Sequence, residues 1–124
     1  MPTWAGWRAA RDVEIRHELG YLNEQDYSNG LDWRRSEVAG FDRLAGSNGD
    51  GPDAMHRFLG SVKSRLVALQ LEDILGVKEQ ANLPGTVDTH PNWRRRLPVG
   101  VKALNGHPAI LAAAKIMKES GRQE

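Results

Sequence analysis

Residues 65–71 read RLVALQL, a short apolar run that carries valine and leucine side chains. Such a run is typical of one strand buried in a parallel sheet. No other segment of the chain predicts a strand as clearly. A lone strand has no partner for its backbone N–H and C=O groups, which would stay unpaired if they were buried. Either residues 65–71 are not a strand, or the chain is one piece of a larger α/β structure.

The N-terminal part of the chain predicts two helices. Residues 4–19 suit the first, with Thr3 as its cap and Gly20 as its stop. Three charged residues spaced four apart are expected to pair along its exposed face: Arg8, Asp12 and Arg16. Residues 23–32, NEQDYSNGLD, mix capping residues with a Ser-Asn-Gly turn signal. A second helix is expected to follow, with Leu31, Val38, Phe41 and Ala45 on one face and Gly46 at its end.

The C-terminal half predicts two more helices around residues 65–71. Residues 47–53, SNGDGPD, have the composition of an exposed loop, and Pro52 suits the first turn of the helix that follows. The clearest helical stripe of the chain comes next: Met55, Phe58, Leu59 and Val62. A last helix is expected from Pro108 to Gly121.

This order of elements is typical of the last part of a (β/α)8 barrel, in which function is carried by the loops that follow the strands. We therefore predict an α/β fold class: the C-terminal portion of such a barrel, mostly helical, with about one core strand. The long loop after residues 65–71, which contains NLPGTVDTHPNWRRRLPV at 82–99, is then the expected functional segment.

Composition excludes several classes of protein. The chain has 124 residues, a formal net charge of +1 and no cysteine. It has no thiolate metal site or disulfide, and its charge is too small to indicate a nucleic acid or an acidic membrane as partner. No apolar run approaches the roughly 20 residues that cross a bilayer, and Arg8 and Arg11 interrupt any signal-peptide core. We expect a soluble cytoplasmic protein.

Two groups of charged residues have alternative interpretations. Glu72 and Asp73 could act as a paired general acid and base, but we favour the first turn of a helix, where acids are stabilised by free N–H groups. Residues 94–96, three arginines beside a tryptophan, could bind phosphate or nucleic acid. We favour ion pairs with acids nearby in sequence, which are Glu72, Asp73, Glu79 and Asp88.

The remaining candidates are histidines and tryptophans. His56, His90 and His107 are scattered without ligand spacing, so we predict no metal site. No glycine-rich phosphate loop follows a strand. Tryptophans can stack on sugar rings, and Trp4, Trp7 and Trp93 are candidates for this role, with core packing as the alternative.

Residues 66–97, LVALQLEDILGVKEQANLPGTVDTHPNWRRRL, closely resemble the C-terminal part of the bacterial 4-alpha-glucanotransferase family, also called amylomaltases or disproportionating enzymes. The motifs QLEDIL, NLPGT and HPNWRRRL in this order and spacing are specific. MPTWAGWRAARD at 1–12 resembles the segment after the seventh barrel strand of the same family. The resemblance spans the chain and is weakest at 23–53.

The resemblance implies a hexosyltransferase that moves an α-1,4-glucan segment to the 4-hydroxyl of glucose or a maltodextrin. The mechanism retains configuration and needs a nucleophilic and an acid/base carboxylate. A third carboxylate, an aspartate, stabilises the transition state, and no metal or organic cofactor is required. By resemblance these carboxylates lie upstream of Met1, so we expect no catalytic residue in this chain and no activity from it alone.

The resemblance also implies substrate-binding residues. Asn82 is the first of them, because its amide can donate to and accept from vicinal hydroxyls. The other expected residues of the glucan cleft are Pro84, Gly85, Asn92, Trp93, Thr3 and Trp4. The expected partners are α-1,4-glucans or maltodextrins and the missing N-terminal part of the barrel, with no nucleic acid and no membrane.

We expect one segment, 1–124, that divides along its length as follows: 1–22, the helix after strand seven; 23–53, a variable excursion; 54–76, a helix plus strand eight; 77–106, the substrate-cleft loop; 107–124, the terminal helix. The alternative function is a non-catalytic α-glucan-binding or regulatory module.

Overall fold

The computed structural model describes residues 3–47 and 51–122. Helices are its only regular secondary structure in this part of the chain. They are α1 Trp4–Arg8, α2 Arg11–Glu18, α3 Glu24–Ala45, α4 Pro52–Ser61, α5 Leu71–Ile74, α6 Val101–Leu104 and α7 Pro108–Glu119. The predicted α/β fold class with a core strand is therefore wrong, since no described residue lies in a strand.

Residues 65–70 belong to no helix or strand. Leu66 is 86% exposed, and residues 66–69 make no backbone–backbone hydrogen bond with any described residue. The apolar composition predicted a buried strand, but a strand needs a neighbouring backbone to pair with, and no described residue pairs with 66–69. Its start is held instead by Arg122, whose guanidinium donates to the carbonyl oxygens of Gly60, Val62 and Ser64.

The helix predicted over residues 4–19 is divided in two. Ala10 has a left-handed backbone conformation, with φ of 55°, between α1 and α2. The break places Arg8 in α1 and Asp12 in α2. Two bidentate pairs with α3 replace the expected pairing: Arg8 with Asp42 at 2.8 and 2.9 Å, and Arg34 with Asp12 at 2.7 and 2.9 Å. Gly20 follows α2 as predicted, with φ of 75°.

The turn predicted within residues 23–32 is also wrong, because this stretch is the first part of α3. Asn23 caps the helix by accepting a hydrogen bond from the N–H of Asp26 at 2.8 Å. Gly30 is required for packing rather than for a turn. A Cβ at Gly30 would lie 2.9 Å from Cγ1 of Val13, so glycine lets α2 and α3 approach closely. Gly46 ends α3 as predicted.

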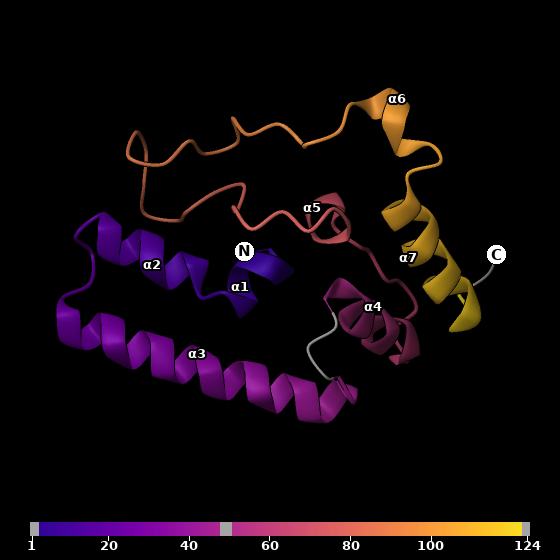
Figure 1. Cartoon of the computed structure of the whole chain (residues 1–124), viewed down its shortest axis with the longest axis horizontal. Helices are drawn as coiled ribbons and strands as arrows, with labels where there is room; N and C mark the ends of the chain where they lie inside the picture. Colours follow the sequence, from indigo (N-terminus) through magenta and orange to yellow (C-terminus); the bar gives the residue numbers. More distant parts are fainter. Residues whose placement is uncertain (1–2, 48–50, 123–124) are drawn as a thin grey trace.

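The helices form two groups (Figure 1). α1 and α2 lie beside the long α3, whereas α4 and α7 pack on each other at one end of the molecule. The aromatic rings of Trp4, Trp7, Phe41 and Phe58 join the two groups, with centroids 4.6 to 6.4 Å apart. Pro52 begins α4 and Pro108 begins α7, as predicted. Of the predicted loop 47–53, residues 48–50 lie outside the described residues.

The long segment between α5 and α6 has no helix and crosses the molecule beside α1 and α2 (Figure 1). Leu83 anchors this segment, because its side chain is only 1% exposed. The predicted loop is therefore packed into the core at Leu83.

Candidate functional site

Three segments that are distant in sequence meet at a small enclosed pocket of about 120 Å³, here called the Asn82 pocket. Its lining residues are Thr3, Gln70, Glu72, Ala81, Asn82 and Trp93. Typical ligand sites enclose roughly 300–1,000 Å³. The Asn82 pocket is therefore smaller than a typical ligand site.

Thr3 forms one wall of the pocket and its hydroxyl is already used. The hydroxyl oxygen accepts a hydrogen bond from the N–H of Gly6 at 3.1 Å, and the hydroxyl O–H donates to the carbonyl oxygen of Lys78 at 3.1 Å. Gly6 permits this contact, because a Cβ there would lie 2.1 Å from the same carbonyl oxygen. The Thr3 side chain thus positions the wall.

Trp4 lies behind this wall, 8% exposed, and not in the pocket. Its ring stacks on Trp7 at 5.2 Å, and its indole N–H donates to the carbonyl oxygen of Gly51 at 3.0 Å. Its backbone N–H donates to the carboxylate of Asp73. The core-packing alternative for Trp4 is therefore the one that the structure supports.

Asp73 and His56 are buried titratable groups beneath Trp4. Burial raises the pKa of Asp73, while the hydrogen bond from Trp4 opposes this shift. Burial lowers the pKa of His56 below its usual value, against the attraction of Asp53 and Asp73. The side chain of His56 is 1% exposed, and neither ring nitrogen has a hydrogen-bond partner among the described residues. A neutral imidazole suits these surroundings.

The loop beyond the pocket begins with a tight turn at residues 83–86. The N–H of Thr86 donates to the carbonyl oxygen of Leu83 at 3.2 Å. Pro84 and Gly85 occupy the two central positions, and Gly85 has φ of 87°, as a type II turn requires. Both central residues are exposed and lie outside the lining of the Asn82 pocket.

Asn92 braces this turn with its whole side-chain amide. Its oxygen accepts a hydrogen bond from the N–H of Leu83 at 2.8 Å. Its nitrogen donates to the carbonyl and hydroxyl oxygens of Thr86 at 3.0 and 2.9 Å. These three contacts leave the amide of Asn92 committed to the loop.

Asn82 and Trp93 are two further residues that line the pocket. The side-chain amide of Asn82 makes no hydrogen bond with any described residue and is half-buried. Trp93 is 76% exposed and has a left-handed conformation with φ of 57°, which is rare for a residue that is not glycine. The backbone N–H of Trp93 donates to the carbonyl oxygen of Ala81 at 2.8 Å, which fixes the main chain at this position.

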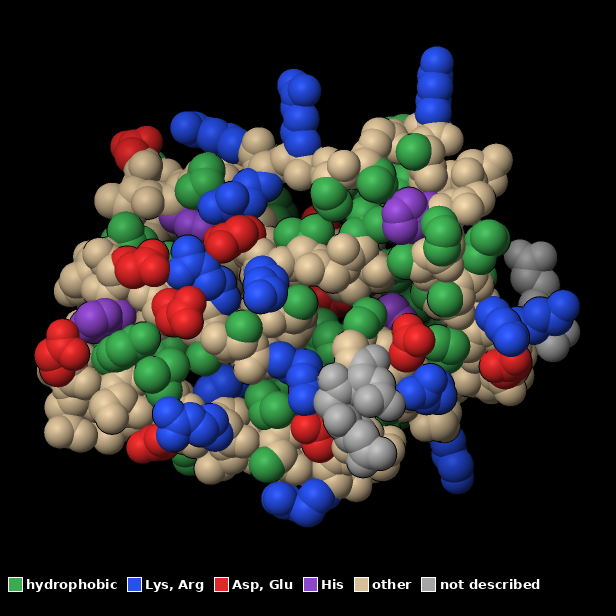
Figure 2. Space-filling model, in the orientation of Figure 1, with side chains coloured by type: hydrophobic (Ala, Val, Ile, Leu, Met, Phe, Trp, Pro, Cys, Tyr) green, Lys and Arg blue, Asp and Glu red, His purple; other side chains and the backbone are tan. Residues whose placement is uncertain are grey.

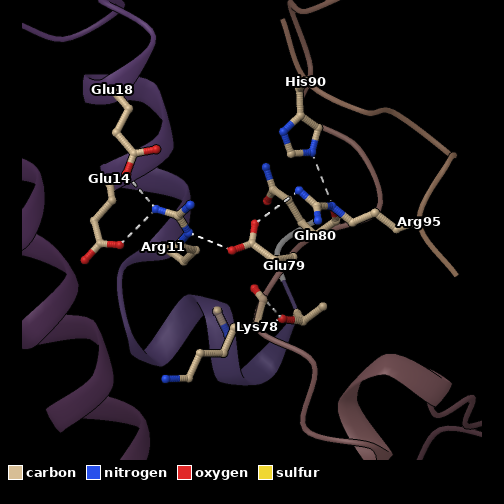
Figure 3. Close-up of polar contacts among 10 residues, drawn as sticks. Arg11, Glu14, Glu18, Lys78, Glu79, Gln80, His90 and Arg95 are labelled. Carbon is tan, nitrogen blue, oxygen red and sulfur yellow. Dashed lines mark hydrogen bonds and ion pairs between the residues drawn. The ribbon is translucent and has the colours of Figure 1, made fainter. Parts of the chain in front are cut away.

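Residues 78–80 are fixed by a network of charges beside the pocket (Figure 3). Glu79 accepts a hydrogen bond from Nε of Arg11 at 2.9 Å, and Arg95 approaches its second oxygen at 3.6 Å. Arg11 also binds Glu14 and Glu18 of its own helix. The ion pair predicted between the arginine run and Glu79 is confirmed for Arg95.

Glu72 and Asp73 lie in the first turn of α5, as we favoured from the sequence. Their side chains separate: Asp73 binds Trp4, whereas Glu72 lines the pocket. The sequence reasoning did not assign Gln70, Glu72 or Ala81 to the site.

No group of three or more His, Asp or Glu side chains could hold a metal ion among residues 3–47 and 51–122. Within the same ranges, every helix is too short or too polar to cross a membrane.

The family model described as 4-alpha-glucanotransferase matches residues 1–102. The chain belongs to this family. It is 34% identical over 122 residues to the 4-alpha-glucanotransferases of Mycobacterium tuberculosis and Mycobacterium bovis, and 27% identical over 114 residues to that of Haemophilus influenzae. These alignments cover 90% and 78% of the chain but only 16% of each relative. No solved structure matches it. The family resemblance seen in the sequence is confirmed.

Proposed function

We propose that the chain supplies part of the glucan-binding surface of a 4-alpha-glucanotransferase. The whole enzyme would transfer an α-1,4-glucan segment to the 4-hydroxyl of glucose or a maltodextrin, with retention of configuration. The observation that carries this proposal is the Asn82 pocket, where an unpartnered amide and an exposed indole meet. Sugar sites combine such hydrogen-bonding groups with aromatic faces.

The expected cleft residues take two roles in this proposal. Asn82 would exchange hydrogen bonds with hydroxyl groups, and Trp93 would stack on a ring. The other expected cleft residues would hold these two in place. Polar groups of Thr3, Trp4 and Asn92 already form hydrogen bonds within the chain. Pro84 and Gly85 lie outside the lining of the pocket.

We propose further that the catalytic carboxylates come from outside this chain. A retaining mechanism places two carboxyl groups about 5–5.5 Å apart across the scissile bond. Among the described residues, Glu72 is the only acid that lines the Asn82 pocket, and its neighbour Asp73 is engaged by Trp4. We propose that the reaction needs no metal or organic cofactor.

The alternative is a non-catalytic α-glucan-binding or regulatory module, which the same pocket with its single carboxylate would also suit. A nucleic-acid partner is less consistent with the charge of the chain. The formal net charge is only +1, whereas nucleic-acid binding depends on Lys and Arg side chains that neutralise phosphates. In Figure 2, acidic and basic side chains are interspersed over the middle of the visible face.

A disproportionation assay with maltotriose tests the proposal. The pure chain and the chain mixed with the N-terminal remainder of a relative are compared by chromatography of the products. We expect glucose and longer maltodextrins only from the mixture, and less with Asn82→Ala in the chain. Products from the pure chain would contradict the missing-carboxylate proposal. If neither sample forms products but the chain binds maltotriose, the non-catalytic binding module would be favoured.

A further inference from the structure

Among the described residues, Asp53 and Glu72 are half-buried acids for which no hydrogen bond or ion pair is found. Asp53 lies near enough to His56 to influence its charge, which leaves the carboxylate of Glu72 without an explanation. It lines the Asn82 pocket, is half-buried, and makes no hydrogen bond or ion pair with any described residue. The other partly buried acids in long-range contacts all have a cationic or N–H partner: Asp12, Asp42, Asp73 and Glu79. An acid without a partner loses hydration without compensation inside the protein, so its position suggests an external partner.

The terminus of α5 does not account for this position. α5 has only four residues, so few aligned peptide dipoles stabilise an acid at its start. Asp73 occupies the same turn and directs its carboxylate to Trp4 instead. Glu72 has no such contact among the described residues, so the packing of α5 does not explain why its side chain lines the pocket beside Asn82.

We propose that Glu72 is a glucan-contacting residue that accepts hydrogen bonds from hydroxyl groups of a glucose unit in the Asn82 pocket. This inference rests on the proposed glucan-binding function. A carboxylate only accepts hydrogen bonds, whereas the amide of Asn82 donates and accepts. Together they match vicinal hydroxyls, each of which donates one hydrogen and offers an oxygen. The negative charge also selects neutral sugars against anionic ones.

Titration of the isotope-labelled chain with maltotriose, followed by NMR, tests this contact. The signals observed are the indole N–H of Trp93 and the side-chain amide of Asn82. We expect Glu72→Gln to weaken maltotriose binding about tenfold, because charge-assisted hydrogen bonds become neutral ones. Glu72→Asp keeps the charge, but its shorter side chain places the carboxylate farther from the sugar, so an intermediate loss of affinity is expected. Asp88→Asn, which removes a charge from an exposed acid outside the pocket, is the matched control.

The outcomes separate the two proposals. Binding by the parent chain with equal affinity in Glu72→Gln overturns the role of Glu72 and leaves the glucan-binding function intact. Equal weakening by Glu72→Gln and Asp88→Asn indicates a general charge effect and also overturns it. No maltotriose-dependent shift of Trp93 or Asn82 in the parent chain overturns both proposals. The thermal melts of the variants check that each one is folded.

Discussion

The carboxylate of Asp73 accepts a hydrogen bond from the backbone N–H of Trp4, 69 residues earlier in the chain. This contact joins α5 to the start of α1, and both groups are buried. It places Thr3 and Glu72 on adjoining walls of the Asn82 pocket. The pocket therefore depends on an interaction that lies outside it.

Asp73→Ala is expected to lower the free energy of unfolding by about 1–3 kcal/mol, because the buried N–H of Trp4 loses its acceptor. Asp73→Asn keeps an acceptor oxygen and is expected to lose less. Urea denaturation measures both, with Asp88→Ala as the exposed control, expected to change stability by less than about 0.5 kcal/mol. Equal losses in Asp73→Ala and Asp88→Ala would contradict the role of this hydrogen bond.

Stability is expected to depend on pH through His56. Its folded pKa lies below the usual 6.5, because burial disfavours the charged ring. The unfolded chain therefore binds a proton first as the pH falls below 6.5, and stability decreases until the lower folded pKa is reached. Asp73 acts in the opposite direction at more acidic pH, since its folded pKa is raised.

Urea denaturation at a series of pH values measures this dependence. His56→Leu is expected to flatten the curve just below pH 6.5 relative to the parent chain, because it removes the buried imidazole. A parent-like slope in His56→Leu would show that another group is responsible.

Gly6→Ala is expected to destabilise the chain by about 1–3 kcal/mol or more, because the new Cβ would meet the carbonyl oxygen of Lys78 at 2.1 Å. Gly40→Ala is the matched control. Its Cβ would meet only Nη2 of Arg43 at 3.8 Å, so its higher helix propensity should add up to about 1 kcal/mol. Thermal unfolding of the two variants should therefore shift in opposite directions.

Asn92→Ala removes three hydrogen bonds that hold the loop, and we expect a loss of about 1–3 kcal/mol of stability and weaker maltotriose binding. Asn92→Asp keeps the acceptor for Leu83 but not the donor to Thr86, so an intermediate loss is expected. Chemical denaturation and the NMR titration measure the two effects. Full binding by Asn92→Ala would argue against the brace.

Trp93→Gly separates stability from binding. Glycine adopts φ of 57° without the strain of a larger residue, so stability should change by less than about 1 kcal/mol. Maltotriose binding should fall about tenfold with the loss of a stacking face. Trp33→Ala, at a tryptophan that is 69% exposed on α3, is the control and should bind as the parent does. Unchanged binding in Trp93→Gly would remove Trp93 from the proposed site.

The sequence by itself determined the family and the local ends of several elements. The motifs QLEDIL, NLPGT and HPNWRRRL were sufficient for the family, which residues 1–102 confirm. Gly46 and the prolines at 52 and 108 predicted helix ends correctly, because a cap or a fixed φ acts within one turn of the chain.

Only the tertiary structure decided the break at Ala10, the full length of α3 and the absence of a strand at residues 65–70. Pairs such as Arg34 with Asp12 depend on how helices meet, and the spacing within one helix does not contain this information. Residues 65–70 had the composition of a strand, but a strand exists only when a second backbone lies beside it. Glu72 entered the candidate site for the same reason: the pocket is made by three segments that sequence alone does not bring together.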